Sequence, residues 1–388
     1  MKLLVFSHKA CWPSAASPSG YATDGGFPFQ MGALSELFDE TVLLVPCGST
    51  GSRAGEIGLH GQGLRIAPLS PRRGLGIYSK LSFLPWLLAN SPTIWREFRR
   101  ADGVHTPIPG DVGTVGMLAA WICRKRLFVR YCGNWLTLKT TADRFWHWFM
   151  EQFAGGKNVM LATGGSDLPP SVKTADMHWV FSTSLTQSEL SHLATGAITW
   201  APRRLRLIIV GRQEGAKGTE ILLEALALIR PDFPEAALDI VGDGSALPAL
   251  KQLAAKLGVS ERVVFHGRLN HAEVIGVMRR AQVFCFPTKS EGFPKVVVEA
   301  LACGLPVIAT PVSVLPQLLR HGCGVILNEA TPTDLARAIK TVMADETQFQ
   351  KMSSQAIATA QQYSLEAWRD EIGKLLASAW GPLKEGRR

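Results

Sequence analysis

Several features that mark specialised classes of proteins are missing from this sequence. No apolar stretch of its 388 residues reaches the roughly 18–20 residues needed to span a bilayer. The apolar run in the N-terminal MKLLVFSHKACWP is too short for a signal peptide, and this segment is predicted to form a first β-strand. There is no internal repeat and no low-complexity tract. We therefore expect an ordinary cytoplasmic globular protein, long enough for two hydrophobic cores.

Metal-binding patterns are also missing. No D-x-D motif occurs, and no cluster of His or Cys has the spacing of metal ligands, so no metal cofactor is expected. The seven cysteines are an odd number and form no C-x-x-C pair; the closest two are Cys123 and Cys132. We expect all seven to be free, buried thiols in a reducing cytosol.

Acidic residues are scarce in one part of the chain. The net charge is +9, and the window from Arg65 to Arg130 holds eleven basic residues against Glu97, Asp102 and Asp111, a local net charge of +8. This window predicts an anionic surface or partner, although a solvated basic face is the common alternative.

Strand-like runs alternate with helical stretches in both halves of the chain. The first half holds KLLVFS, TVLLVP, RLFVRY, NVMLAT and HWVFST, and the second half holds RLIIV, ALDIV, RVVFHG and QVFCF. Helices are predicted near 219–229, 247–257 and 271–280. This alternation is typical of doubly wound α/β domains with parallel sheets. We predict one domain at 1–196, a linker at 197–204, a second domain at 205–363, and a C-terminal helix within 364–388 that crosses back to the first domain.

The segment SEGFPKVVVEALACGLPVIAT, residues 290–310, follows a predicted strand and ends in another. Pro294 suits the first turn of a helix, where its missing N–H costs nothing. The loop before the helix then lies at the carboxyl end of a parallel sheet, where open α/β sheets bind ligands. Glu291 and Glu299 can each accept two hydroxyl donors, such as the vicinal hydroxyls of a nucleotide sugar.

Two further groups in the same region suit the phosphates of such a ligand. The free N–H groups of Lys295, Val296 and Val297 are predicted to meet the phosphates at the start of the helix. In VGRQEGAKGTE, Arg212 and Lys217 lie on a glycine-containing loop before the next helix. Two cations beside a helix N-terminus suit a diphosphate. Both loops are expected at the same edge of one sheet. A solvated loop Arg and Lys is the alternative for that motif alone.

Four motifs in order, VGRQEGAKG, IVGDG, FHGRL and EGFPKVVVEALACGLPVIAT, resemble the donor domain of the family 4 glycosyltransferases. These are retaining enzymes with the GT-B fold, in which two Rossmann-like doubly wound domains face each other across a cleft. The E-x7-E pattern of this family corresponds to Glu291 and Glu299. The resemblance covers about 203–328 tightly and the N-terminal half loosely.

The resemblance implies roles for individual residues. Arg212 and Lys217 would hold the donor diphosphate, Glu291 the transferred sugar as a catalytic residue, and Glu299 the ribose. Backbone would meet the base or the sugar and phosphates at Gly267, Arg268, Leu269, Gly292, Phe293, Pro294, Lys295 and Val296.

The N-terminal half matches the family more weakly. In DGGFPFQMGALSELFDETVLLV, Gly25 and Gly26 would let backbone approach the donor phosphate, although a simple turn is the alternative. Tyr21 and Asp24 would face the acceptor. His105, in ADGVHTPIPGD, would line the acceptor cleft and is a second catalytic candidate; a structural histidine is the alternative, and His8 is a weaker candidate of the same kind. The usual Pro-Asn-Gly-rich linker is replaced by ITWAPRR.

The resemblance implies a hexosyltransferase that uses a nucleoside-diphosphate sugar and no metal, with leaving-group charge met by cations and a helix end rather than by a general acid. A GT-B sugar-nucleotide epimerase would share the donor site. A nicotinamide dehydrogenase is disfavoured because VGDGSAL lacks the third glycine of the fingerprint. A nucleic-acid binder would use the basic window but shows no matching motif. A catalytically silent scaffold is the remaining alternative.

The acceptor prediction rests on LGIYSKLSFLPWLLANSPTIWREFRR, residues 75–100, which is apolar, rich in tryptophan and flanked by arginines. Its apolar core at 81–89, interrupted by Pro85, is too short to span a membrane but suits an interfacial segment. An ordinary helical pair packed on the first sheet is the alternative. The interfacial reading predicts peripheral binding to the inner leaflet of the plasma membrane and a lipid-linked saccharide acceptor in cell-surface polysaccharide or glycolipid assembly. No nucleic-acid partner is expected.

Overall fold

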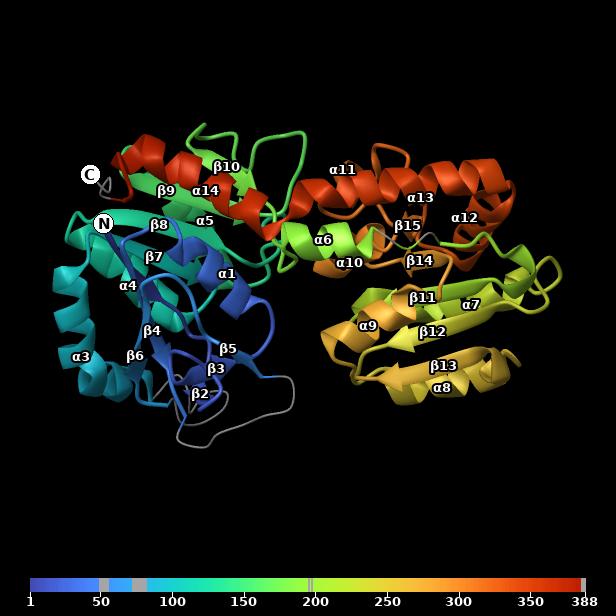
Figure 1. Ribbon diagram of the computed structural model, residues 1–388, viewed down its shortest axis with the longest axis horizontal. Coiled ribbons are helices and arrows are strands. Elements are labelled where there is room, and N and C mark those ends of the chain that lie inside the picture. The colour runs from blue at the N-terminus through green and yellow to red at the C-terminus, as the bar shows by residue number, and fades with distance from the viewer. Residues whose placement is uncertain (49–55, 72–81, 195, 197, 385–388) are drawn as a thin grey trace. The chain divides into compact units, whose positions relative to one another are not determined.

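The chain folds into two compact units. The computed structural model describes residues 1–48, 56–71, 82–194, 196 and 198–384 (Figure 1). The first unit comprises 1–164, 168–184 and 365–388, and the second comprises 165–167 and 185–364. The sequence placed the corresponding divisions at 197–204 and at Ser364.

The second unit is built on a fully parallel sheet. Its strands lie in the order β13-β12-β11-β14-β15-β16, with bounds β11 (Arg206–Val210), β12 (Ala237–Val241), β13 (Val263–Gly267), β14 (Val283–Phe286), β15 (Val307–Ala309) and β16 (Gly324–Ile326). Its helices are α6 (Gln187–Leu193), α7 (Thr219–Ile229), α8 (Leu247–Lys256), α9 (His271–Met278), α10 (Lys295–Ala302), α11 (Leu315–Leu319), α12 (Pro332–Met343) and α13 (Glu346–Ala360). The strand order reverses beside β11, so the loops after β11 and β14 flank the switch point of the sheet.

The first unit has a larger sheet of the same kind, in the order β10-β9-β8-β7-β1-β4-β6. Its strands are β1 (Lys2–Phe6), β4 (Glu40–Pro46), β6 (Leu64–Leu69), β7 (Gly103–Ile108), β8 (Arg126–Tyr131), β9 (Asn158–Thr163) and β10 (Met177–Val180). A small antiparallel sheet joins β2 (Trp12–Pro13), β3 (Tyr21–Thr23) and β5 (Ile57–Gly58). The predicted fold class, two doubly wound parallel-sheet domains, is confirmed.

Helices cover both faces of the first sheet. One face packs against α3 (Phe83–Arg100), α4 (Asp111–Ile122) and α5 (Thr141–Phe153). The other packs against α1 (Phe27–Ser35) and α14 (Leu365–Trp380). Strands buried on both sides must be apolar throughout, which explains why runs such as KLLVF and RLFV lack strict alternation.

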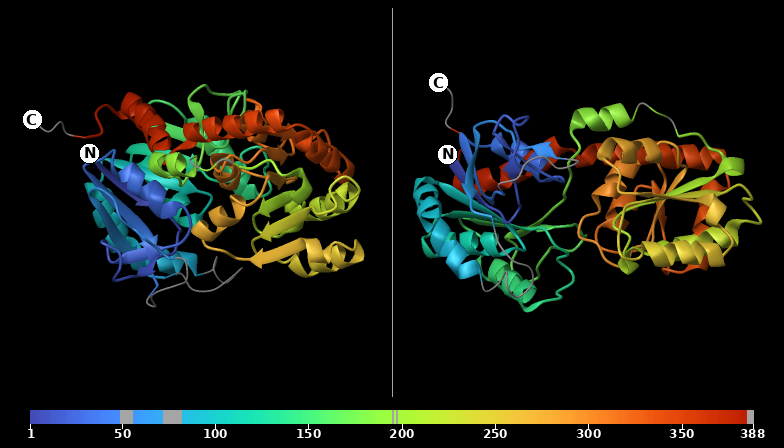
Figure 2. Two further views of the ribbon diagram at one scale, coloured as in Figure 1. Left: turned by 45° about the vertical axis from the view of Figure 1, so that its right-hand side comes forward. Right: turned by 90° about the horizontal axis from the view of Figure 1, so that it is seen from below.

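Helix α14 belongs to the first unit although the whole second unit precedes it (Figure 2). Its side chains Trp368, Ile372, Leu376 and Trp380 are all at most 5% exposed and join the core beside β1 and β8. The indole N–H of Trp380 donates to the carbonyl of Lys157 at 2.9 Å. The first core therefore needs residues from both ends of the chain.

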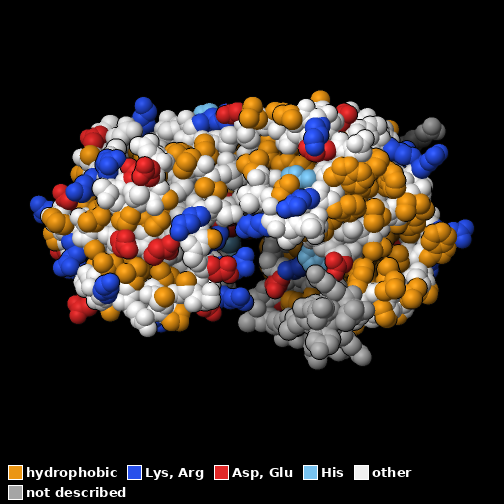
Figure 3. Space-filling view, turned by 180° about the vertical axis from the view of Figure 1, so that it is seen from behind, with side chains coloured by type: hydrophobic (Ala, Val, Ile, Leu, Met, Phe, Trp, Pro, Cys, Tyr) orange, Lys and Arg blue, Asp and Glu red, His pale blue; other side chains and the backbone are white. Residues whose placement is uncertain are grey.

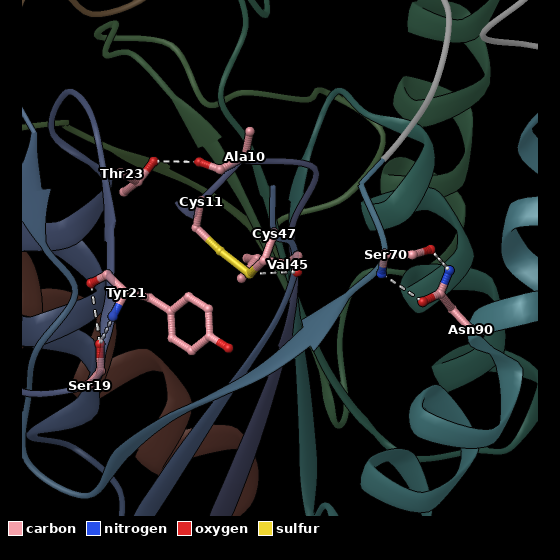
Figure 4. The surroundings of a disulfide bond; sticks show 9 residues. All are labelled: Ala10, Cys11, Ser19, Tyr21, Thr23, Val45, Cys47, Ser70 and Asn90. Carbon is pink, nitrogen blue, oxygen red and sulfur yellow. Dashed lines mark hydrogen bonds between the residues drawn. A yellow bond between two sulfur atoms is a disulfide. The ribbon is translucent and has the colours of Figure 1, made fainter. Parts of the chain in front are cut away.

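One disulfide corrects an expectation drawn from the sequence. Cys11 and Cys47 are bonded, with their Cα atoms 4.6 Å apart (Figure 4). They follow β1 and β4, which pair in parallel, and the amide of Cys11 donates to Pro46 at 2.9 Å. The expectation of seven free, buried thiols is wrong, because strand pairing brings these two together across 36 residues. Of the five free cysteines, Cys123 and Cys132 are exposed and three are buried.

A buried arginine ties several elements of the first unit together. Arg130, near the end of β8, is 3% exposed, and its Nη2 donates to Oε1 of Gln30 on α1 at 2.9 Å. The Gln30 amide donates onward to Oγ of Ser182 and to the carbonyl of Thr183, each at 3.0 Å. The guanidinium also lies over the Trp368 ring, 5.0 Å from its centroid. One side chain thus contacts α14 directly and reaches the segment 182–183 through Gln30.

We expect Gln30→Ala to lower the free energy of unfolding by about 1–3 kcal/mol, because it leaves buried groups on Arg130 and Thr183 without their hydrogen bonds. Urea unfolding followed by circular dichroism measures this change. Gln152→Ala, at an exposed position of α5, is the matched control and should change stability by no more than about 0.5 kcal/mol. Equal effects of the two substitutions would contradict a structural role for the Gln30 network.

Candidate functional site: the switch point of the second sheet

Two loops meet at the carboxyl edge of the second sheet. The loop 211–218 follows β11, and the loop 287–294 follows β14, its neighbour at the switch point. The amide of Lys289 donates to the carbonyl of Ala216 at 2.8 Å, and the Thr288 hydroxyl donates to the same carbonyl at 3.1 Å. The predicted convergence of these loops is observed.

Lys217 and Glu291 form an ion pair between the two loops. Their side chains are only 20% and 13% exposed, so both charges are largely removed from water. Nζ of Lys217 also lies 5.6 Å from the centroid of the Phe286 ring. The pair places an ammonium and a carboxylate side by side at the switch point, and each neutralises the other.

Close backbone approach shapes the first loop. Gly218 has φ +72°, and a Cβ there would lie 2.1 Å from the carbonyl of Pro287. The glycine is therefore needed for the two loops to touch. Immediately beyond it, α7 begins at Thr219 as the sequence predicted.

The loop after β11 contains a buried glutamine that no sequence motif predicted to be important. Gln213 is fully buried; its Nε2 donates to the carbonyls of Gly211 at 2.8 Å and Val241 at 3.1 Å. Its Oε1 accepts from the Thr219 hydroxyl at 2.7 Å. Gln213 therefore fixes the loop between Arg212 and Lys217 by linking backbone carbonyls that follow β11 and end β12 to the first residue of α7.

Arg212 differs from Lys217 in its surroundings. Its side chain is 81% exposed, and its Nη1 lies 3.6 Å from Oε1 of Glu214. An exposed pair of this kind is worth little, so the guanidinium is available to a ligand at small cost.

Glu299 lies on α10, eight residues after Glu291, with its side chain 12% exposed. Nε2 of His271, the first residue of α9, is 3.6 Å from Oε1 of this carboxylate. The contact with Glu299 raises the pKa of His271 above its ordinary value, against the opposing effect of burial. The sequence pointed to the start of α9 but not to this contact. The capping box of Asn270 and Glu273, which fixes that start, is the signal that could have placed His271.

The backbone donors of this region differ in part from the prediction. The amide of Lys295 donates to Phe293 at 3.1 Å, and that of Val297 donates to Pro294 at 3.0 Å. The prediction that these two N–H groups are free is therefore wrong, because a tight turn precedes α10. The Gly292 carbonyl accepts from the hydroxyl of Ser313 at 2.5 Å.

The remaining predicted residues of the second unit lie at the same edge. Gly267 ends β13 with φ +67°, Arg268 is exposed, and Leu269 packs partly on the core. The half-buried Phe293 ring lies 5.9 Å from that of Tyr363.

In the first unit, the glycine loop stands at the start of α1. Gly25 has φ +70°, and Gly26 is the residue before the helix. Asp24 forms an ion pair with Lys9, and Thr23 donates through Oγ1 to the carbonyl of Ala10 at 2.7 Å (Figure 4). Tyr21 lies on β3 and is half-buried. The loop that the sequence assigned to donor and acceptor is thus tied to the segment after β1.

His105 is fully buried within β7. Its ring stacks on Phe128 with centroids 4.0 Å apart, and Nδ1 lies 3.0 Å from the Phe128 carbonyl. Burial, helped by the positive charge of Arg130, lowers the pKa of His105 to about 3. This environment favours the structural alternative over contact with an acceptor. His8 is exposed and stands beside Gly110, where a Cβ would lie 2.3 Å from its Nδ1.

Within the described ranges, no group of three or more His, Cys, Asp or Glu side chains is arranged to hold a metal ion. In the same part of the chain, no helix combines the length and apolar character needed to cross a bilayer.

Known proteins resemble this chain both in fold and, over the second unit, in sequence. Almost the whole chain shares its fold with solved structures: HepE from Anabaena in complex with UDP and glucose is 19% identical, with a TM-score of 0.68 over 97% of this chain and all of that one. Sucrose-phosphate synthase from Thermosynechococcus elongatus is 18% identical, with a TM-score of 0.71 over 97% of this chain and 98% of that one. At these identities the likeness establishes the fold.

The family assignment comes from the second unit. Residues 197–362, which are less than half of the chain, match the sequence model of the family described as Glycosyl transferases group 1. A curated relative, D-inositol 3-phosphate glycosyltransferase from Corynebacterium jeikeium (strain K411), is 32% identical over 183 residues, 45% of this chain and 44% of that protein. The matched part thus spans less than half the length of that relative. The family resemblance predicted from the four motifs is confirmed.

Proposed function

We propose that this protein is a retaining, metal-independent glycosyltransferase. It moves a hexose from a nucleoside-diphosphate sugar to a saccharide acceptor. The observation that carries the proposal is the Lys217–Glu291 ion pair at the switch point of a sheet whose sequence matches the group 1 glycosyltransferase model, with Glu299 on the helix that follows the Glu291 loop. Open α/β sheets bind nucleotides at this position.

The chemistry of the side chains supports distinct roles in donor binding. Lys217 and Arg212 supply positive charge for the diphosphate, and Glu291 and Glu299 accept hydroxyl donors from the sugar and the ribose. In the structure Lys217 is held by Glu291. Donor binding exchanges this contact: the ammonium turns to phosphate, and the carboxylate is released to the sugar hydroxyls.

The same cations support departure of the nucleoside diphosphate. Negative charge develops on the bridging oxygen as the bond to the anomeric carbon breaks, and an ammonium that has already moved to the phosphate on donor binding stabilises this charge. Retention at the anomeric carbon rests on the family alone.

The reaction should be detectable with a panel of UDP-, GDP- and ADP-sugars and saccharide acceptors. We expect release of nucleoside diphosphate with one of them, unchanged by chelator, and a product whose anomeric coupling in early proton spectra equals that of the donor. An inverted coupling would end the retaining assignment. Sugar epimerised without any acceptor would point instead to an epimerase.

The binding site itself is tested by Lys217→Ala and Glu299→Ala. Each should weaken binding of the nucleoside diphosphate by about 1.5–3 kcal/mol in calorimetry, the value of a hydrogen bond to a charged group, without unfolding the protein. Lys256→Ala and Glu261→Ala, exposed at the opposite edge of the sheet, are matched controls that should bind as the wild type does. Wild-type affinity in either site variant would show that the nucleotide lies elsewhere.

We further propose that the first unit docks on an anionic membrane surface, with a lipid-linked saccharide as the acceptor. Helix α3 presents Leu84, Leu88 and Trp95 along one side, one and then two turns apart, with exposures of 62%, 66% and 57%, followed by the exposed Arg99 and Arg100. Trp121, Ile122 and Trp148, on α4 and α5, are also exposed on the face that carries α3. Figure 3 shows hydrophobic side chains gathered over this face with Lys and Arg beside them.

The structure changes the roles predicted for several residues of the segment 75–100 and of the basic window. Residues 72–81 lie outside the described residues. Trp86 is 8% exposed and donates to the carbonyl of Ser70 at 2.7 Å, so it is a core residue. The basic window is also partly neutralised: Arg65 and Arg96 contact the buried Glu97, and the hydrogen bond from Arg65 lowers the pKa of that carboxyl. The count of +8 already includes Glu97, but Glu40, which lies outside the window, also contacts Arg65 at 3.2 Å and lowers the charge that can meet a membrane below +8.

Flotation with liposomes tests this docking surface. Binding should require anionic lipid and fall with added salt, because each basic residue near such a surface contributes roughly 1 kcal/mol. Trp95→Ala combined with Arg99→Glu should reduce the bound fraction, whereas Leu228→Glu, at a 49% exposed position of α7, should not. Equal binding to neutral vesicles, or no binding, would favour a soluble acceptor.

A further inference from the structure

One contact at the second-unit site has no role in the proposed function so far. His271 begins α9, four residues after β13 ends at Gly267, and it reaches across to Glu299 on α10. The imidazole is 53% exposed, whereas the carboxylate is 12% exposed. Water can reach the histidine while the carboxylate is held largely within the protein.

The contact involves one of the two carboxylate oxygens of Glu299. Nε2 of His271 approaches Oε1 of Glu299 at 3.6 Å. Among the described residues, His271 is the partner that the structure gives to this carboxylate. A carboxylate has two oxygens and about four acceptor positions, so one oxygen held by a cation leaves the other for hydroxyl donors.

We propose that His271 is a positioning residue for the donor nucleotide: it holds one oxygen of the Glu299 carboxylate so that the other is presented to the ribose hydroxyls. This inference rests on the proposed function of Glu299. It also places His271 between two expected parts of the site, the base-binding backbone at 267–269 and the ribose-binding carboxylate.

The proposal has a pH dependence whose sign follows from the charges around the ring. Glu299 faces His271 from α10 and Glu189 acts on it from α6, and both favour the imidazolium. The pKa of His271 is raised, so the charged pair is complete below the ordinary histidine value and is lost as the pH rises through the raised value. The diphosphate of a nucleotide sugar stays fully ionised over this range and adds to the attraction for the imidazolium. Affinity for the nucleotide sugar should therefore fall between pH 6 and pH 8.5.

The experiment has two independent measurements. In the first, the imidazole of His271 is titrated by NMR without nucleotide in the wild type and in Glu299→Gln. We expect a raised pKa that drops toward the ordinary value in the variant. An unchanged titration would show that the contact does not operate in solution, and it would overturn the inference whatever the function of the protein.

The second measurement is calorimetry with UDP-glucose, GDP-mannose and ADP-glucose between pH 6 and pH 8.5. For the nucleotide sugar that binds, wild-type affinity should fall about threefold to tenfold with rising pH, the range of one partly exposed charge interaction. His271→Gln, which keeps an N–H donor but cannot ionise, should bind more weakly at pH 6 with a flat profile. His321→Gln, at an exposed histidine of the same unit, should retain the wild-type profile.

The outcomes separate the two proposals. A wild type and His271→Gln with equal affinities and equal pH profiles would overturn the role of His271 while leaving the glycosyltransferase proposal intact. No binding by a folded wild type to any of the three nucleotide sugars would overturn both. Thermal melting of each variant distinguishes loss of binding from loss of the fold.

Discussion

Both units are organised by the constraint that parallel strands cannot be joined by a tight turn. Each strand must be followed by a crossover before the next can pair, so all carboxyl ends meet at one edge of the sheet. In each unit the order of strands reverses beside the first strand, between β1 and β7 and between β11 and β14. Connections leave that point in opposite directions, and open α/β sheets bind their ligands beside it. The location of Lys217 and Glu291 follows from this topology before any side chain is considered.

Charged side chains at the second switch point are paired with one another. Lys217 contacts Glu291, and His271 contacts Glu299. Isolated charges in such partly buried positions would be unfavourable, because their hydration is largely lost. A ligand that carries both phosphates and hydroxyls can replace each internal partner by one of its own groups. Under the proposed function, the affinity for the donor would equal the difference in free energy between these two sets of contacts, so opposite charges are compatible with one donor site.

The sequence predicted the parts of the fold that depend on local patterns. Helix α7 has the predicted bounds, and the strands β11 to β14 lie within the predicted runs. The family motifs also led to Lys217, Glu291 and Glu299, because each of these residues lies within one short, continuous stretch of sequence. What the sequence did not reveal depends on residues far away along the chain. The Cys11–Cys47 bond follows from the pairing of β1 with β4, and the burial of His105 follows from the cover that α1 and α14 give to its face of the sheet. His271 was missed for the same reason, since its partner is on a different helix 28 positions later.

The return of α14 to the first unit has a consequence for the order in which the protein can be made. During synthesis, strands β1 to β10 leave the ribosome first, but the sheet face that carries Leu3, Val5 and Phe128 is covered in part by side chains of α14, the last helix of the chain. The second unit, by contrast, is almost entirely one continuous stretch, 185–364. It can complete its core while the first unit still exposes an apolar face. The domain whose synthesis begins first is therefore the last to mature, and its nascent form is the one that depends most on protection from aggregation.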